Sequence, residues 1–370
     1  MASSRPRAPS AWRWGASRAA RAGRRWPRTR ACATRSPACA TRSRRWRASS
    51  RPARERGRGL DQCWRRARDL GAALGDWVEP QEGSGLVQWF ETYRSGFALA
   101  LTPLDVAGRF RELMQAWPGG WVFTSATLSV GGRFEHFRER MGLDEAEELQ
   151  VDSPFDYARN ALLYLPQGLP NPSAPGYTDA VLDAAEPVLA ASGGRAFVLF
   201  TSYRALHRAA ARLRAADRHR VLVQGEAPKH ELVARFRAAG DAVLLGTASF
   251  WEGVDVAGPA LSCVIIDKLP FAAPGDPVVQ ARLDALRAAG GNPFADYQLP
   301  QAVIALKQGA GRLIRSVEDR GVLMLCDPRL RGRGYGRVFL ESLPPMRRTD
   351  ALAEVRSFFG DAAAAEGPGA

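Results

Sequence analysis

Short runs of valine, leucine and isoleucine alternate with amphipathic segments over most of the chain, and this alternation constrains the fold more than any other feature. The runs lie at 195–203 (RAFVLFTSY), 220–226 (RVLVQGE), 241–247 (DAVLLGT), 261–271 (LSCVIIDKLPF) and 320–327 (RGVLMLCD). Helical spacing of apolar residues follows the first two runs, at 204–216 and 230–239. Apolar strands that alternate with helices indicate a parallel sheet covered by helices on both faces. We therefore predict an α/β fold.

Polar residues follow several of these runs directly. Thr201-Ser202-Tyr203, Gln224-Gly225, Gly246-Thr247 and Asp267-Lys268 all stand at predicted strand ends. A further run at 121–128 (WVFTSATL) has the pattern of a buried strand that ends in Thr124 and Ser125. Ligands of open parallel sheets bind at the carboxyl ends of the strands. A binding site is therefore expected at that edge.

The net charge of +14 belongs to one end of the chain. Residues 1–60 contain 18 arginines, no lysine and one acid, Glu55, so this segment carries +17 and the other 310 residues carry −3. With almost no branched apolar residues it cannot bury enough surface to fold, and we predict that it is disordered. Three interpretations stay open: a basic nucleic-acid arm, a transit-like peptide, or sequence from a non-native reading frame, which we favour.

Cysteine and hydropathy patterns argue against several classes of protein. The five cysteines form no CxxC pair and are odd in number, so we expect no disulfide framework and no metal site. No apolar stretch approaches the length needed to span a bilayer. We therefore expect no membrane association and a soluble, cytoplasmic protein.

The segment KQGAGRLIRS, residues 307–316, places two glycines among basic residues. Pro300 can occupy a first helical turn, so residues 300–317 are predicted to form one helix. Helical geometry then puts Val303, Leu306, Ala310, Leu313 and Val317 on an apolar stripe, and Gln301, Gln308, Gly311, Arg312 and Arg315 on the opposite face. Two interpretations compete for these arginines: an ordinary solvated face, or a pair presented to the charge of a reacting phosphate.

The order of the motifs favours the second interpretation. SATL (125–128), SPFDY (153–157), LFTSY (199–203), FWEGVD (250–255), IIDKLPF (265–271) and QGAGRLIR (308–315) occur in this order. In this respect the chain, from about Leu60 to Pro345, resembles the DinG/YoaA-type (XPD-like) superfamily 2 ATP-dependent DNA helicases, and in particular their C-terminal portion. The resemblance implies a RecA-like second helicase domain, preceded by a remnant of the first RecA-like domain and by the arginine-rich head.

The resemblance also implies roles for individual residues. Residues Thr124, Ser125, Ala126 and Thr127 match motif III, which couples nucleotide state to strand binding. Residues Thr201, Ser202 and Tyr203 of motif IV and Thr247 of motif V are expected to bind single-stranded DNA. Residues Glu252, Gly253, Asp255 and Gly311 are expected to face the nucleotide. In motif VI, Gln308, Arg312 and Arg315 are expected to be catalytic, with the arginines directed at the γ-phosphate. For Phe250 and Trp251 we prefer core packing to base stacking.

Two motifs that such a helicase needs are not found in the sequence. Neither the phosphate loop GxxxxGK[ST] nor a DE-x-H box precedes motif III, and DEAE at 144–147 follows it in a polar stretch. We therefore expect a truncated protein. Its predicted parts are the head (1–60), a remnant of the first helicase domain with motif III (61–150), the second helicase domain (151–348) and a C-terminal helix with a frayed tail (349–370).

These features leave three hypotheses for the chain itself. It is part of an ATP-dependent helicase that uses ATP and Mg²⁺ on single-stranded DNA and is inactive alone. Alternatively, it is a non-catalytic nucleic-acid-binding module, or a fragment that complements a separately encoded first helicase half. No iron–sulfur cluster is expected, because the scattered cysteines do not match the family's four-cysteine insertion. We also expect exposed apolar surface around residues 86–130, where the remnant domain lacks most of its strands.

Overall fold

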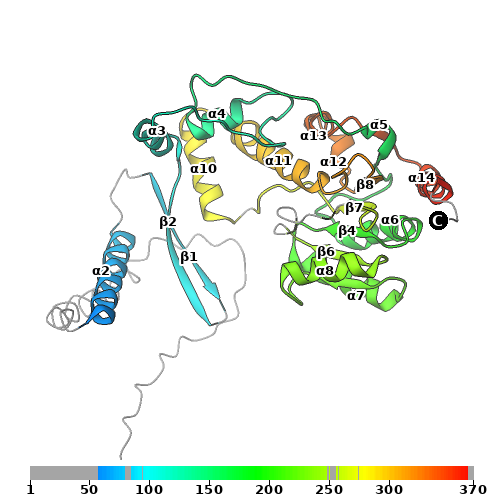
Figure 1. Cartoon of the computed structure of the whole chain (residues 1–370), viewed down its shortest axis with the longest axis horizontal. Helices are drawn as coiled ribbons and strands as arrows, with labels where there is room; N and C mark the ends of the chain where they lie inside the picture. The colour runs from blue at the N-terminus through cyan, green and yellow to red at the C-terminus, as the bar shows by residue number, and fades with distance from the viewer. Residues whose placement is uncertain are drawn as a thin grey trace, which may run out of the picture. The chain divides into compact units, whose positions relative to one another are not determined.

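The computed structural model describes residues 57–79, 85–93, 95–247, 250, 256, 258–273 and 275–365. The chain divides into two compact units. The first unit contains residues up to 102 together with 273–280, and the second contains residues 103–272 and 281–370. Figure 1 labels the helices and strands of both units. The domain boundaries inferred from the sequence stay a prediction.

The first unit contains helix α2 (Arg58–Val78) and a two-stranded sheet of β1 (Leu86–Tyr93) and β2 (Gly96–Pro103). The indole of Trp77 donates to the carbonyl of Trp89 at 3.3 Å, which ties the helix to β1. No residue of α2 is buried. Residues 1–56 lie outside the described residues. The predicted disordered segment extends too far, however, because Arg58 to Leu60 already belong to α2.

The second unit is a parallel α/β structure, as predicted. Among the described residues, seven strands form one sheet in the order β5-β6-β4-β7-β8-β3-β9, and every pairing is parallel. The strands are β3 (Ala161–Tyr164), β4 (Ala196–Leu199), β5 (Val221–Val223), β6 (Val243–Gly246), β7 (Cys263–Ile266), β8 (Gly321–Leu325) and β9 (Arg347–Thr349).

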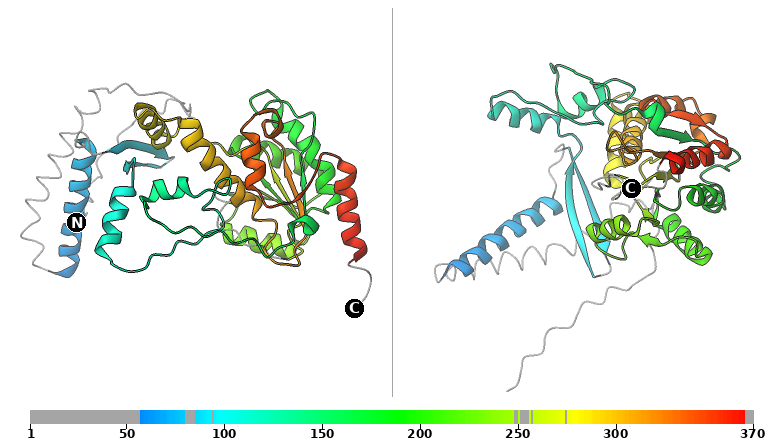
Figure 2. Two further views of the ribbon diagram at one scale, coloured as in Figure 1. Left: turned by 90° about the horizontal axis from the view of Figure 1, so that it is seen from above. Right: turned by 45° about the vertical axis from the view of Figure 1, so that its right-hand side comes forward.

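Helices cover both faces of this sheet (Figure 2). One face packs against α8 (Lys229–Ala239), α11 (Leu299–Ala310) and α13 (Gly336–Ser342), and the other against α6 (Tyr177–Ala191), α7 (Tyr203–Ala216) and α14 (Leu352–Ala365). Successive strand residues alternate between the two cores, which explains the continuous apolar runs of the sequence. The remaining helical elements are α3 (Ala107–Ala116), α4 (Glu135–Met141), α5 (Tyr157–Asn160), α10 (Pro277–Ala288), the π-helix η2 (Phe294–Gln298) and α12 (Arg329–Gly332).

The prediction of a strand at 121–128 is wrong. These residues form no strand, and Val122 is 84% exposed. The alternate residues Trp121 and Phe123 instead pack with Phe110 of α3 and Phe137 of α4, with ring centroids about 6 Å apart. No described strand lies beside this segment, so its backbone has no ladder to join. The apolar residues of this segment therefore contribute to a small aromatic cluster and not to a strand.

The ends of two other elements also differ from the prediction. The helix expected over 300–317 ends at Ala310. The last turns tighten, because the amides of Arg312 and Leu313 bond to carbonyls three residues back. Leu313 and Ile314, just beyond the helix, are both buried. At the C-terminus, α14 continues to Ala365, so the residues from 361 are not all frayed.

Candidate functional site

Four strand ends meet at one edge of the sheet in the second unit. β5, β6, β4 and β7 are adjacent and parallel, so their carboxyl ends lie side by side. Gln224 directly follows β5, Thr247 follows β6 and Asp267 follows β7. Thr201 is the second residue after β4. The expectation that these polar ends share one edge is therefore confirmed by the strand order.

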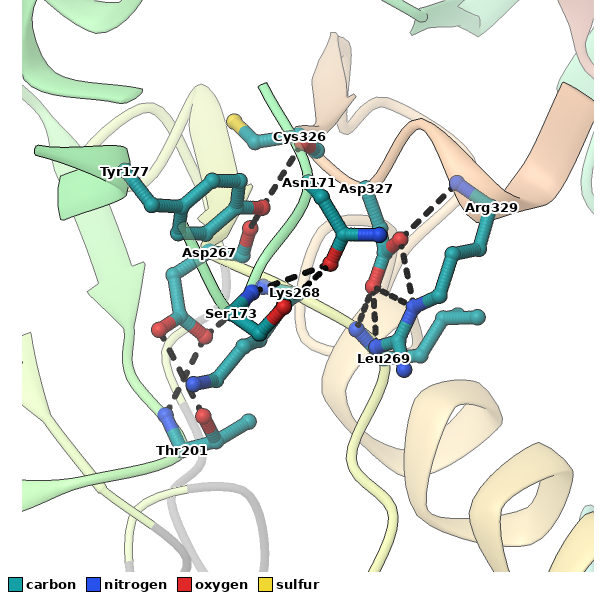
Figure 3. A network of polar contacts seen from close by, with 10 residues as sticks. All are labelled: Asn171, Ser173, Tyr177, Thr201, Asp267, Lys268, Leu269, Cys326, Asp327 and Arg329. Atoms are coloured by element: carbon teal, nitrogen blue, oxygen red, sulfur yellow. Dashed lines mark hydrogen bonds and ion pairs between the residues drawn. The ribbon is translucent and has the colours of Figure 1, made fainter. Parts of the chain in front are cut away.

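Asp267 fixes the backbone at the end of β4, as Figure 3 shows. The amide of Thr201 donates to Asp267 Oδ1 at 3.1 Å, and the amide of Lys268 donates to the same oxygen at 2.7 Å. Asp267 is only 3% exposed. Burial raises its pKa to about 7, against the opposing charge and amide of Lys268. Ser202, which follows Thr201, caps α7: its side-chain oxygen accepts the amide of Ala205 at 3.3 Å.

A second buried carboxylate, Asp327, lies just after β8 and holds the segment that follows β7 (Figure 3). It accepts the amide of Leu269 at 2.8 Å and pairs with the guanidinium of Arg329 at 2.6 Å. The hydroxyl of Tyr177 lies 2.6 Å from the carbonyl of Asp267 and 2.9 Å from that of Cys326, and burial raises its pKa. The sequence did not lead us to predict this role for Asp327. The available signal was an acidic residue directly after an apolar run and two residues before an arginine.

Gln224 connects two of the predicted DNA-binding residues. Its Oε1 accepts the amide of Thr247 at 2.6 Å and the Thr247 hydroxyl at 3.1 Å. Its Nε2 donates to the hydroxyl of Tyr203 at 2.8 Å. Tyr203 is 56% exposed and its ring stacks on His207, whereas Thr247 is 6% exposed. The structure thus brings Tyr203 and Thr247 together through a residue that the sequence reasoning did not select.

The predicted catalytic residues of motif VI lie at the end of α11 and just beyond it. Gln308 is in the helix, Gly311 is its exposed C-terminal cap, and Arg312 and Arg315 follow in a turn. The Nε of Arg312 donates to the carbonyl of Gln308 at 3.2 Å. Both arginines are half-buried. The correction to the helix therefore moves the arginines from a helical face to a compact turn.

Asp319 organises that turn. Its Oδ2 accepts the amides of Arg315 at 2.7 Å and Ser316 at 2.8 Å, and its Oδ1 accepts the Ser316 hydroxyl at 2.9 Å and the amide of Gly258 at 3.0 Å. Burial alone would raise the pKa of Asp319, but these donors outweigh it and hold the pKa below its usual value. Nothing in its polar sequence context predicted this role.

The predicted coupling residues Thr124, Ser125, Ala126 and Thr127 form a loop. The hydroxyls of Ser125 and Thr127 lie 3.1 Å apart, and the amide of Thr127 donates to Ser125 Oγ. Two residues later, the carbonyl of Ser129 accepts the ammonium of Lys307 at 2.9 Å. Burial lowers the pKa of Lys307. This contact joins the chain just after motif III to the residue that precedes Gln308.

Three predicted nucleotide-facing residues, Glu252, Gly253 and Asp255, lie outside the described residues, as does Trp251. Phe250 is 2% exposed within the core, so the preference for core packing is confirmed at that position. Thr247, before this segment, is bonded to Gln224, and Gly258, after it, is bonded to Asp319.

The rest of the described chain adds two observations. No helix in it combines the length and the apolarity needed to cross a lipid bilayer. No group of three or more His, Cys, Asp or Glu side chains is placed there to hold a metal ion. Cys263 in β7 and Cys326, directly after β8, are buried free thiols, and burial raises the pKa of both.

Comparison with known proteins first defines the class. Residues 185–346 match the family described as the helicase C-terminal domain. A solved structure titled as an XPD helicase superposes with a TM-score of 0.55 at 15% identity, over 78% of this chain and 54% of that one. This likeness shows the fold. The parallel sheet of the second unit therefore has the RecA-like fold of XPD-like helicases, and residues 185–346 within it match the helicase C-terminal domain.

The sequence comparison then gives the particular family. The chain is 50% identical over 274 residues to the ATP-dependent DNA helicase YoaA of Escherichia coli, covering 74% of this chain and 43% of that protein. It is 40% identical over 264 residues to the ATP-dependent helicase DinG of Mycobacterium tuberculosis, covering 70% and 40%. The chain belongs to the DinG/YoaA-type helicases, and it spans less than half the length of these curated relatives.

Proposed function

We propose that this chain supplies the second half of an ATP-dependent DNA helicase of the DinG type. Single-stranded DNA passes along the sheet edge that carries Thr201, Ser202, Tyr203 and Thr247. One observation carries the proposal: residues from separate predicted motifs lie at neighbouring ends of one parallel sheet, and Gln224 joins two of them. Hydroxyls and backbone amides at such an edge suit phosphate contacts, and an exposed tyrosine ring suits stacking on a base.

The chain's own donors suit one side of a nucleotide site. Arg312 and Arg315 offer planar guanidinium groups for the γ-phosphate of ATP, and Gln308 adds a neutral donor. Asp319 holds the backbone from which Arg315 projects. The residues for the opposite side, a phosphate loop and a Mg²⁺-binding carboxylate box, do not occur in the printed sequence. When bound, ATP with Mg²⁺ would supply the phosphoryl group whose hydrolysis drives movement. In this proposal Thr124, Ser125, Ala126 and Thr127 respond to the nucleotide state.

Hydrolysis by the purified chain tests the proposal. We expect ATP turnover at background level, with or without single-stranded DNA. Adding the N-terminal half of a YoaA-type relative, which carries the phosphate loop in the proposed arrangement, should raise turnover. Arg312→Ala should abolish that gain, since one such arginine contributes about three or more powers of ten. Arg333→Ala, an exposed arginine outside the motifs, serves as the control. Turnover by the chain alone would contradict the proposal.

A second function, non-catalytic nucleic-acid binding, is favoured by the charge of residues 1–60. Their 18 arginines and single acid would bind phosphates without regard to sequence. Deleting residues 1–60 should then remove most of the affinity for single-stranded DNA and flatten its salt dependence. Fluorescence anisotropy across a salt series measures both quantities. Unchanged affinity after the deletion would place the binding energy in the folded units.

A separately encoded first helicase half would be the partner in the complementation experiment above. The cytoplasmic location is expected for a protein that acts on chromosomal DNA.

A further inference from the structure

The amide orientation of Gln224 is determined by its partners. A backbone N–H can only donate, so the atom that faces the amide of Thr247 at 2.6 Å must be the oxygen Oε1. The hydroxyl of Thr247, at 3.1 Å from the same oxygen, is then also a donor. Nε2 consequently faces Tyr203. The assignment follows from the chemistry of the contacts.

This orientation sets the direction of the Tyr203 hydroxyl. Nε2 of an amide has only hydrogens to offer, so the Tyr203 oxygen accepts the 2.8 Å bond. The phenolic hydrogen therefore points away from Gln224. Tyr203 is 56% exposed, is the first residue of α7 and stacks on His207 with ring centroids 6.2 Å apart. Its ring and hydrogen are thus both held on an accessible surface.

Resting on the proposed function, we propose that Gln224 is a positioning residue for single-strand binding. It holds the Tyr203 ring at the strand path and directs the phenolic hydrogen toward an acceptor on the strand, such as a phosphate oxygen. The same side chain bonds to Thr247, which is the first residue after β6. Gln224 therefore links Thr247 of motif V to Tyr203 of motif IV.

Two substitutions separate this role from simple support of the fold. Gln224→Glu keeps an acceptor for the Thr247 amide and hydroxyl, but its second oxygen turns the phenolic hydrogen of Tyr203 inward. Gln224→Met keeps the length of the side chain and removes every hydrogen bond. If Gln224 only supports the fold, the Glu variant should behave like the wild type. If it directs Tyr203, both variants should lose contact with the strand.

The test is photo-cross-linking of the full chain to a single-stranded oligothymidylate that carries iodouracil, at saturating oligonucleotide. Mass spectrometry then measures the yield at Tyr203 separately from the yield at other sites, so binding by the arginine-rich head does not mask it. We expect both Gln224 variants to lower the Tyr203 yield by about threefold or more, the effect of one hydrogen bond. Glu226→Gln, in the same loop but paired with Arg214, is the matched control and should leave the yield unchanged.

Each other outcome has a distinct meaning. Cross-linking at Tyr203 that neither variant changes would overturn the role of Gln224 and leave the proposed function standing. Cross-links found only away from Tyr203 would overturn both, because the strand would not follow this edge. A loss in the Met variant alone would overturn the role too, since it would reduce Gln224 to a support for Thr247. Thermal unfolding of each variant, with the yield at the other cross-linked peptides, identifies any loss of folded protein.

Discussion

Asp267 shows how one buried side chain makes the site sensitive to pH. Its carboxyl accepts two backbone amides at the end of β7, yet burial still raises its pKa to about 7 from 3.8. The folded protein therefore binds the Asp267 proton more tightly than the unfolded chain does. The resulting stabilisation is complete below about pH 4 and is lost as the pH rises through about 7.

We predict that Asp267→Asn removes this part of the pH dependence. An asparagine can accept both amides through its oxygen and carries no charge to desolvate. Between acidic and alkaline pH the wild type should lose up to about 4 kcal/mol of stability from this group, and the variant should not. Urea unfolding on both sides of pH 7 measures the difference. Parallel pH profiles for the two proteins would show that Asp267 is ionised at lower pH than its burial indicates.

At the scale of elements, the sequence predicted the buried strands well, because continuous valine, leucine and isoleucine runs suit a sheet covered on both faces. The end of helix α11 at Ala310 could not be predicted from a local apolar pattern. It depends on Asp319, which bonds to Arg315 and Ser316 locally but also to Gly258, about sixty residues away. The strand expected at 121–128 failed for a related reason, since a strand needs a neighbour that its own residues do not specify.

For the candidate site, too, the sequence predicted some features and not others. Motif order indicated which residues matter, and strand ends indicated where they meet. The links between them were not visible, because Gln224 and Asp267 act through contacts with residues distant in sequence. A glutamine or aspartate after an apolar run is a common pattern. Only the strand order shows which loops it faces.

Gly321 provides a test of packing at the start of β8. A Cβ there would lie 2.6 Å from the carbonyl oxygen of Ser262 and 2.6 Å from Leu313 Cδ1. We predict that Gly321→Ala destabilises the protein by about 1–3 kcal/mol, because backbone and core must both shift. Gly332→Ala, where no heavy atom lies within 4 Å, should be nearly neutral. Denaturant midpoints measure both, and equal midpoints would mean that β8 and Ser262 separate easily.

At the scale of the whole molecule, the two units differ in how much they bury. Apolar side chains are exposed around residues 86–130, as predicted: Phe90 and Phe97 of the first unit, and Trp117 and Val122 near the start of the second, are each more than half exposed. By contrast, every residue of β3, β4, β6, β7 and β8 is buried. Stability that comes from apolar burial must therefore be concentrated in the second unit.

Hydrogen exchange should report this difference directly. We predict that backbone amides of α2, β1 and β2 exchange at least about a hundredfold faster than those of the central strands, since their opening exposes little further apolar surface. Mass spectrometry of peptides from 58–78, 86–103 and 321–325 gives the comparison. Equal protection of the two units would mean that the first unit is held by interactions other than burial.

The strand order also has a consequence for synthesis on the ribosome. The strands β4, β5, β6 and β7 leave the ribosome soon after one another and are neighbours in the sheet, so this part of the sheet can assemble early. β3 emerges before all of them, but within the described sheet it pairs with β8 and β9, and its first pairing joins Ala161 to Gly321. The nascent chain must therefore carry the apolar segment of β3 unpaired while 160 further residues, from Ala161 to Gly321, are synthesised.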